Sequence, residues 1–286
     1  MHLGPLVFFG APVGEWVQRP TVSGVRAHET LQTRYRGDVL EVVIDHPHSD
    51  LNAVDELLHR ELTVLFADLR EEQQARAVLL TGRGRAFSAG GDFNWFPQLR
   101  ETGTLDALRH DARHLITDLL DVELPIVAAV NGPAVGLGAS IALLCDVIFM
   151  AESATIADPH VRVGLVAGDG GTVIWPLAVG PARAKQYLLT GDPIGAVEAE
   201  RIGLVNAVVP DDALDDAAFA FAQRLAAGAP LAVRYTKLAV NKLLKDALNT
   251  TFDAATALEL VTFKSDDHAE ALAAIRERRS PDFKGQ

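Results

Sequence analysis

The sequence predicts an α/β fold in which a core of alternating strands and helices precedes a helical C-terminal region. Up to about residue 210, short runs rich in β-branched residues alternate with longer stretches of helical periodicity. Beyond Asp211 only helical patterns remain. The chain has 286 residues, of which 49% are hydrophobic and 22% are charged, so it can bury a sizeable core.

Local patterns place the elements of the core. In the first helical stretch, leucines and Phe66 recur at three- and four-residue spacings, which gives one apolar stripe. Glycine-rich turns end two of the strands. In chain order we expect a strand at Val39–Asp45, a helix at Val54–Arg70, a strand at Ala77–Thr81, a helix at Thr104–Leu120, a strand at Pro125–Val130, a helix that ends near Cys145, and strands at Val147–Met150 and Thr155–Ala157.

The chain is expected to have three parts. Residues 1–35 carry glycines and prolines without a period and are expected to form an irregular arm. Residues 36–210 form the α/β core, and residues 211–286 form the helical region. The helices expected in that region are Ala213–Gly228, Leu231–Leu248, Phe252–Phe263 and Asp266–Arg279.

Composition excludes several classes of function. The chain has 26 Lys and Arg against 38 Asp and Glu, a net charge of −12, whereas a nucleic-acid binder needs a basic face. The lone Cys145 rules out an intrachain disulfide and a cysteine zinc cluster. The nearest candidate for a membrane-spanning helix, Pro125–Cys145, is interrupted by a turn at Asn131–Pro133, and no basic segment precedes an apolar start. We therefore expect no membrane or nucleic-acid partner and a cytoplasmic location.

Two glycine-rich turns each follow a strand and lead towards a helix. They are Arg85–Asp92 and Asn131–Gly138. Such turns can aim backbone N–H groups at one point, as an oxyanion hole does, and the helix dipole favours negative charge there. The residues alone leave open the alternative that both are only tight turns.

Other interpretations of these turns are weaker. Neither turn has the dinucleotide pattern G-x-G-x-x-G, and the chain has no phosphate-binding P-loop. The segment Ala86–Gly90 loosely imitates a nucleophile elbow centred on Ser88, but Gly82–Arg85 separate that serine from the strand. A serine hydrolase is thus a minor alternative.

A third segment, Asp158–Gly171, holds a histidine, two aspartates and several glycines. A carboxylate beside an imidazole can fix its tautomer and tune it as an acid or base near neutral pH. His160 and Asp169 are therefore candidate catalytic residues. The alternative is that Asp169 caps a helix from about Gly170. His110 and His114 sit alone on a polar helix face, so no metal site is predicted.

Together these turns resemble those of the crotonase (enoyl-CoA hydratase/isomerase) superfamily, over about residues 36–284. Each motif alone is weak, and the combination is specific. The matching segments are Ala86–Asp92, Asn131–Gly138, Cys145–Asp146, Leu189–Gly191, Ala199–Val209 and Arg278–Lys284.

The resemblance implies a spiral of ββα units with a C-terminal trimerisation region, and a homotrimer or homohexamer. It also implies an acyl-CoA substrate and a role of the fatty-acid-metabolism kind, with CoA as part of the substrate and no separate cofactor or metal. The thioester carbonyl would accept hydrogen bonds from the N–H groups of Gly91 and Leu137. The residues implied to bind substrate or CoA are Ser88, Ala89, Asp92, Phe93, Asn94, Ser140 and Arg278.

The chain departs from the family at both hydratase glutamates. Ser140 stands at the first of these positions and His160 at the second. His160 with Asp169 nine residues on is similar to the pair found in carbon–carbon hydrolases of the 6-oxocamphor hydrolase type, which cleave β-diketones. Because the turn typical of CoA-thioester members is retained, we expect an acyl-CoA enzyme with His160 as acid/base, oriented by Asp169.

Two alternatives remain open at this stage. The first is a β-diketone hydrolase that works by retro-Claisen cleavage. The second is a catalytically silent homologue that binds CoA.

Overall fold

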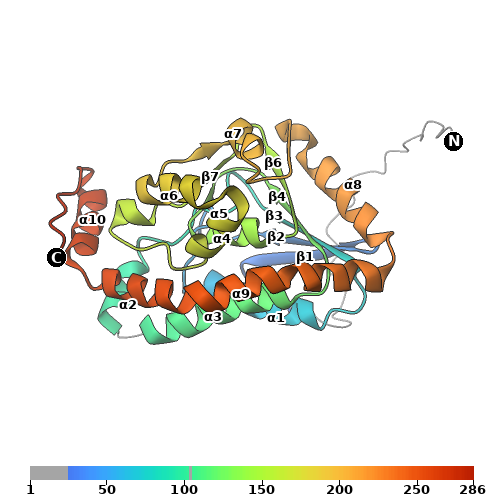
Figure 1. Ribbon diagram of the computed structural model, residues 1–286, viewed down its shortest axis with the longest axis horizontal. Helices are drawn as coiled ribbons and strands as arrows, with labels where there is room; N and C mark the ends of the chain where they lie inside the picture. The colour runs from blue at the N-terminus through green and yellow to red at the C-terminus, as the bar shows by residue number, and fades with distance from the viewer. Residues whose placement is uncertain (1–24, 103–104) are drawn as a thin grey trace.

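The computed structural model describes residues 25–102 and 105–286 (Figure 1). Its main sheet has six strands in the order β1-β2-β3-β4-β6-β9. Only β1 runs antiparallel to its neighbour, and the other pairings are parallel. The strands of this sheet are β1 (Leu31–Arg36), β2 (Val39–Ile44), β3 (Ala77–Gly82), β4 (Ile126–Val130), β6 (Val147–Ala151) and β9 (Ala207–Val209).

A second, smaller sheet consists of β5 (Ala134–Val135), β7 (Thr155–Ala157) and β8 (Ile194–Gly195). Two isolated β-bridges continue this second sheet: Ser88 pairs in parallel with Ala134, and Val54 pairs in parallel with Gly91. Successive stretches of chain therefore add a strand to the main sheet, a strand or bridge to the second sheet, and then a helix. This is the expected ββα spiral, and it brings the ends of neighbouring second strands to one edge.

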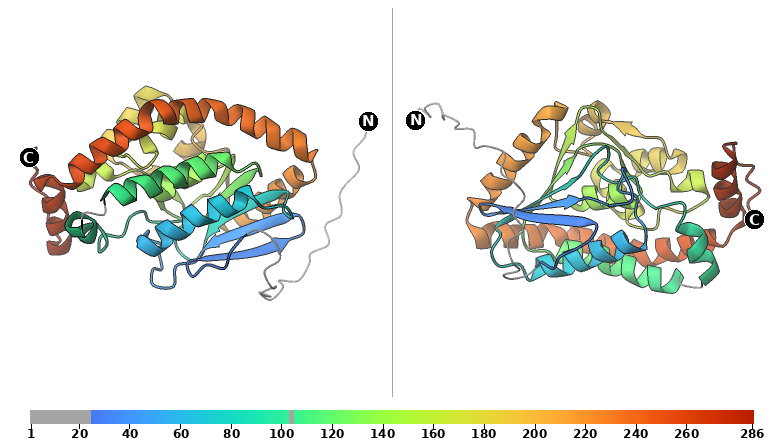
Figure 2. Two further views of the ribbon diagram at one scale, coloured as in Figure 1. Left: turned by 90° about the horizontal axis from the view of Figure 1, so that it is seen from below. Right: turned by 180° about the vertical axis from the view of Figure 1, so that it is seen from behind.

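Helices cover both faces of the main sheet. Helix α8 packs on β3 and β4, and α3 lies between α1 and α9 on the opposite side, as the two views of Figure 2 show. The helices are α1 (Glu56–Arg70), α2 (Phe96–Thr102), α3 (Leu105–Asp121), α4 (Leu137–Leu144), α5 (Gly171–Val179), α6 (Pro181–Thr190), α7 (Ala196–Arg201), α8 (Leu214–Ala226), α9 (Pro230–Phe263) and α10 (Asp266–Glu277), with 3₁₀ turns η1 (His160–Val163) and η2 (Asp211–Ala213).

Most elements lie where the sequence predicts them, and the fold class is confirmed. Two expectations are wrong. Residues 31–35 are not irregular, because they form most of β1, which pairs along its whole length with β2. The two helices expected at Leu231–Leu248 and Phe252–Phe263 are one continuous helix, α9. Residues 1–24 of the expected arm lie outside the described residues.

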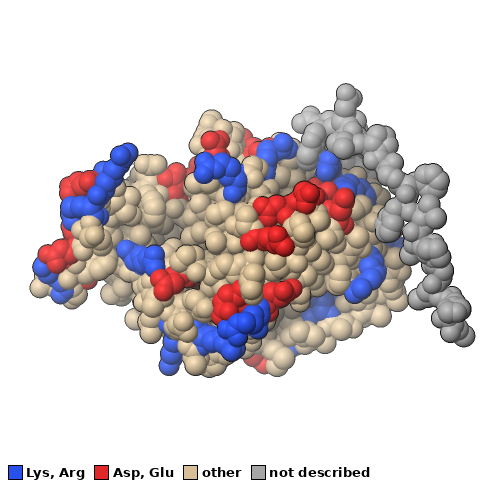
Figure 3. Space-filling view, turned by 90° about the horizontal axis from the view of Figure 1, so that it is seen from above, with Lys and Arg blue, Asp and Glu red and all other residues tan. Residues whose placement is uncertain are grey.

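The charged side chains on the surface have both signs. On the face that Figure 3 shows, acidic and basic side chains are interspersed, and no basic patch extends across it. Among the described residues, none of the helices has both the length and the apolarity that a bilayer crossing needs.

Candidate active site

The two glycine-rich turns meet at the edge of the second sheet. The N–H of Ser88 donates to Pro133 O at 3.2 Å, and the N–H of Val135 donates to Ser88 O at 2.9 Å. Beyond this pairing, Gly90 adopts φ +78°, and a Cβ there would lie only 2.7 Å from the carbonyl oxygen of Val135. Gly136 adopts φ +52°. A side chain at Gly90 would push the two turns apart, so glycine is required there.

Each turn leaves one backbone donor at this meeting point. Leu137 is the first residue of α4, so its N–H has no acceptor within the helix. Gly91 follows Gly90 in the first turn. Within the described part of the chain, neither N–H donates to a protein acceptor. Gly91 and Leu137 are the two donors that the sequence predicts for an oxyanion hole, and their position is compatible with that role.

Asn52 holds the first turn in place, which the sequence analysis did not anticipate. It adopts φ +51°, and its side-chain amide faces the carbonyls of Arg83, Ala86 and Phe87 at 3.0–3.3 Å. The hydroxyl of Ser88 donates to Asn52 O at 2.8 Å, and Ser88 is buried. Ser88 therefore fixes the turn, and this geometry does not favour the serine-hydrolase alternative.

His160 begins the 3₁₀ turn η1 and lies against the second glycine turn. Its Cε1 would be 3.4 Å from a Cβ built on Gly136, the residue before Leu137. Its Nδ1 lies 2.5 Å from Oδ1 of Asp158, which is buried. The imidazole is thus held beside the predicted oxyanion donors, and its Nε2 would lie 4.0 Å from the same Cβ position.

Two more carboxyl groups face His160 Nε2. Asp169 Oδ2 lies 3.5 Å away and Glu259 Oε1 lies 3.9 Å away. Ser140, from α4, donates to Asp169 Oδ1 at 3.2 Å. The expectation that Asp169 orients the imidazole needs correction, because Asp158 makes the shorter contact. The alternative that Asp169 caps a helix is also supported, because its carboxylate accepts a hydrogen bond from the backbone N–H of Gly171, the first residue of α5.

Burial and charge shift the titration of this cluster. Burial by itself lowers the pKa of His160, but the carboxylates of Asp158 and Asp169 raise it well above 6.5. Burial raises the pKa of Glu259 to about 8, and it also raises the pKa of Asp169. His160 therefore carries a proton at neutral pH, and Glu259 is neutral there. The cluster holds protons beside two backbone donors.

The other predicted site residues fall into two groups. Ala89 and Asp92 pair through their backbones with the segment that leads into α1, at Leu51 and Val54. Asp92 and Asn94, with three charged residues of the α1 region and Trp95, line a groove beside Gly91. Phe93 is 43% exposed.

Arg278 lies at the end of α10, at one end of the molecule in Figure 1. In the described part of the chain, no ion pair joins it to Asp158, His160 or Asp169, and its expected contact with a CoA phosphate stays a prediction.

Glu259 is the functional candidate that sequence reasoning missed. It belongs to the buried face of α9, together with Phe252, Ala255, Thr256 and Phe263. A glutamate on an otherwise apolar helical stripe is a signal that the sequence does contain, because charged residues are rarely buried without a partner. What the sequence could not show is that this face meets η1.

Comparison with known proteins identifies the family. Residues 34–286 match the sequence family described as enoyl-CoA hydratase/isomerase. The chain belongs to this family. A probable mitochondrial enoyl-CoA hydratase of Dictyostelium discoideum is 33% identical over 88% of this chain and 90% of its own length. A putative enoyl-CoA hydratase of Thermus thermophilus is 36% identical over 87% of this chain and 98% of its own length.

Solved structures of the superfamily share the fold. An enoyl-CoA hydratase/isomerase from Mycobacterium paratuberculosis superposes with a TM-score of 0.82 at 39% identity, covering 86% of this chain and 98% of that one. A β-diketone hydrolase from the cyanobacterium Anabaena, solved with (S)-3-oxocyclohexyl acetic acid, superposes with a TM-score of 0.78 at 32% identity. The coverage is 83% of this chain and 95% of that one. The fold thus carries more than one chemistry.

Proposed function

We propose that this protein acts on an acyl-CoA thioester through an enolate, with His160 as the proton donor and acceptor. The observation that carries the proposal is that two backbone N–H groups, which have no protein acceptor in the described part of the chain, lie near a largely buried imidazole. Gly91 and Leu137 would bind the thioester oxygen, where negative charge develops, and each such donor contributes about 3 kcal/mol to transition-state stabilisation. Membership of the enoyl-CoA hydratase/isomerase family supports a CoA substrate.

The state of His160 defines its role. Because its pKa is raised well above 6.5, the imidazolium predominates at pH 7. It can donate a proton to the α-carbon of the enolate, and it becomes a base once that proton has left. Asp158 at Nδ1 stabilises the charged form and leaves Nε2 as the reacting nitrogen. Glu259 and Asp169 would replenish the proton.

The residues argue against ordinary two-glutamate hydration. The hydroxyl of Ser140 donates to Asp169, and a serine is too weak a base to activate water unaided. Proton transfer at the α-carbon, as in isomerisation, needs only the groups that are present. Turnover of 2-enoyl-, 3-enoyl- and saturated acyl-CoA thioesters, followed by mass spectrometry and NMR, tests this proposal. Binding without turnover of any thioester would instead support a catalytically silent CoA-binding homologue.

A second candidate function is carbon–carbon hydrolysis of a β-diketone, and two observations favour it. The first is the similarity to the Anabaena hydrolase. The second is the groove beside Gly91, whose charged lining is Asp55, Glu56 and Asp92 against Arg60, a net negative surface that would repel the phosphates of CoA. In that reaction water adds to one carbonyl, the C–C bond breaks, and the electron pair passes to the enolate that His160 protonates.

One experiment separates the two candidates. Cyclic β-diketones are incubated with the protein in the same assay as the thioesters. If a diketone gains the mass of water and opens to a keto acid while no thioester changes, the second candidate replaces the first. If only thioesters react, the groove does not hold the phosphates and the first candidate stands.

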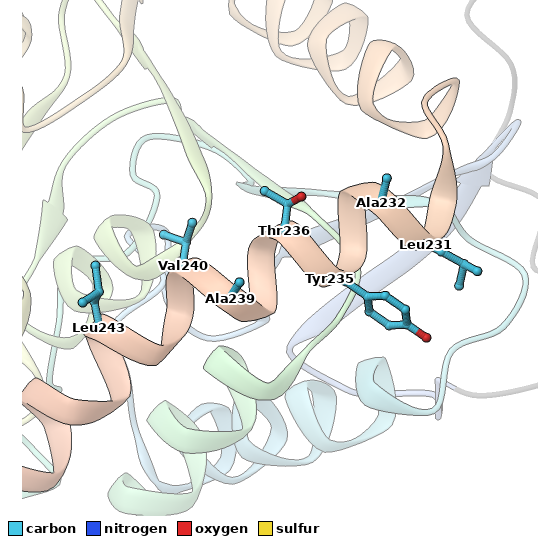
Figure 4. A pocket seen from close by; sticks show the side chains of 7 residues that line it. All are labelled: Leu231, Ala232, Tyr235, Thr236, Ala239, Val240 and Leu243. Atoms are coloured by element: carbon cyan, nitrogen blue, oxygen red, sulfur yellow. The ribbon is translucent and has the colours of Figure 1, made fainter.

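We also propose that the protein assembles as a homotrimer or homohexamer through α9. The exposed face of its first half is apolar, as Figure 4 shows, and Leu231 and Leu243 are more than 60% exposed. The side chains that line this shallow surface are Leu231, Ala232, Tyr235, Thr236, Ala239, Val240 and Leu243. An apolar stripe of this length on one helix is typical of a surface covered by a protein partner.

A further inference from the structure

Helix α3 carries a histidine pair that the proposed function does not use. His110 and His114 are four residues apart, so both project from the same face of the helix. Both are exposed, and the side chain of His110 is 67% exposed. Their ring centroids are 4.4 Å apart, and the two Nε2 atoms face each other at 3.3 Å. One of these two nitrogens carries the proton that they share, and with both rings protonated at Nδ1 instead, both Nε2 lone pairs could bind one ion.

The spacing of the two nitrogens fits one metal ion. Zinc binds imidazole nitrogen at about 2.0–2.1 Å in tetrahedral geometry, which places two nitrogen ligands about 3.3 Å apart. The observed separation of the two Nε2 atoms is 3.3 Å, which matches this spacing. We therefore infer that His110 and His114 form a surface site for a divalent transition-metal ion of the zinc type, with water in the remaining positions. The sequence analysis predicted no metal here, because spacing along the chain does not show rotamers.

The surroundings of the pair are compatible with this ligand set. Asp111 Oδ1 lies 3.8 Å from Nδ1 of His110, on the side away from His114. A carboxylate on that side favours the tautomer in which Nε2 is the ligand. The neighbouring Arg113 is engaged by Asp253 at 2.5 Å, so its charge is compensated. Leu115 and Ile116, on the buried side of the same helix, pack in the core and fix the position of the helix.

Calorimetric titration of the tag-free, full-length protein with zinc chloride tests the inference. We expect one ion per chain, bound more weakly than in a four-ligand structural site, and no binding of magnesium, which prefers oxygen ligands. His110→Ala and His114→Ala should each weaken zinc binding at least about tenfold. His48→Ala, which removes an exposed loop histidine, is the matched control and should change nothing.

The two alanine variants also distinguish this site from a second possible zinc site at His160, because zinc bound there would not depend on His110 or His114. Asp158, His160 and Asp169 offer ligand atoms within 4.8 Å of one another, and zinc could bind there instead. Alanine is the best helix former, so both variants should retain the circular dichroism spectrum of the wild type. Absence of zinc binding by the wild type, or undiminished binding by both alanine variants, overturns the inference.

Discussion

At the scale of single residues, the candidate site depends on how His160 is surrounded. The sequence places a histidine and an aspartate nine residues apart, and from this the acid/base candidate can be predicted. It cannot show that Asp158, two residues before the histidine, makes the closest contact, because that depends on the backbone of η1. Glu259 lies 99 residues further along the chain and reaches the site only through the packing of α9.

We predict that Asp158→Asn lowers the pKa of His160. Without that carboxylate, burial dominates, and a nearby charge of opposite sign typically accounts for about 1–3 pH units. His160 then loses, at a lower pH than in the wild type, the proton that it donates to the enolate. The pH profile of kcat/KM should show its basic limb shifted to lower pH by at least about one unit. Asp192→Asn, which changes an exposed ion pair, should leave the limb in place. An unshifted limb in Asp158→Asn would show that another group sets it.

Because the pKa of Glu259 is raised, we predict that the stability of the protein decreases as pH rises. Its carboxyl has a pKa of about 8 in the folded protein and 4.5 as a free group, so between these values the folded state binds the additional proton. The free energy of unfolding therefore falls as pH rises from about 5 to 8, by at most a few kcal/mol. In Glu259→Gln this contribution vanishes. Chemical denaturation at pH 6 and pH 9 should show a smaller loss of stability for the variant than for the wild type, and equal losses would contradict the assignment.

At the scale of elements, the sequence predicts individual strands better than it predicts their pairing and continuity. The β-branched runs that form β2, β3 and β4 are recognisable because both faces of these strands are buried. Helix α9 is continuous although Asn249, Thr250 and Thr251 interrupt its apolar pattern. Polar side chains at the surface do not break a helix, and Thr250 bonds back to Asp246 O at 2.8 Å. Strand β1 is missed because it lacks apolar alternation, since Leu31 is its one buried residue and its half-buried positions are Gln32, Arg34 and Arg36.

The second glycine turn gives a prediction at this scale. Gly136 has φ +52° and ψ −121°, a conformation nearly restricted to glycine, and a Cβ there would lie 3.4 Å from Cε1 of His160. Gly136→Ala should lower the free energy of unfolding by about 1–3 kcal/mol and reduce turnover, because the backbone of the turn that precedes Leu137 must leave this conformation. Gly195→Ala is the control, since that glycine has φ −76° and open space around its Cβ position. Equal effects of the two substitutions in thermal denaturation would refute the claim.

At the scale of the whole molecule, a two-sheet spiral creates the site and leaves an apolar face on α9. The spiral brings Gly91 and Leu137 together although they are 46 residues apart in the sequence. This is possible because the segments that precede them pair in parallel in the second sheet. Resemblance to a family predicts this architecture, whereas hydrophobic periodicity alone predicts only the layers. The assembly remains a prediction that solution measurements must test.

Leu243→Asp tests the assembly. Light scattering of the wild type should give three or six times the chain mass of 30.7 kDa. A charge buried in an apolar interface should shift the variant to smaller species. Leu189→Asp is the matched control, because Leu189 on α6 is also 71% exposed but lies outside the α9 surface. A monomeric wild type, or a Leu243→Asp variant of unchanged mass, would contradict the proposed interface.

The central claim, that Gly91 and Leu137 stabilise a thioester enolate which His160 protonates, is tested most directly by α-proton exchange. A saturated acyl-CoA such as butyryl-CoA is incubated with the protein in D₂O, and loss of the α-proton signal is followed by NMR. Exchange begins with removal of the α-proton, which needs the neutral form of His160, so the account predicts exchange with the wild type that becomes faster as pH rises. In His160→Ala, exchange should fall by about 10²–10⁴-fold while the thioester still binds, because the proton carrier is removed and the backbone donors remain. Undiminished exchange in His160→Ala would contradict the account.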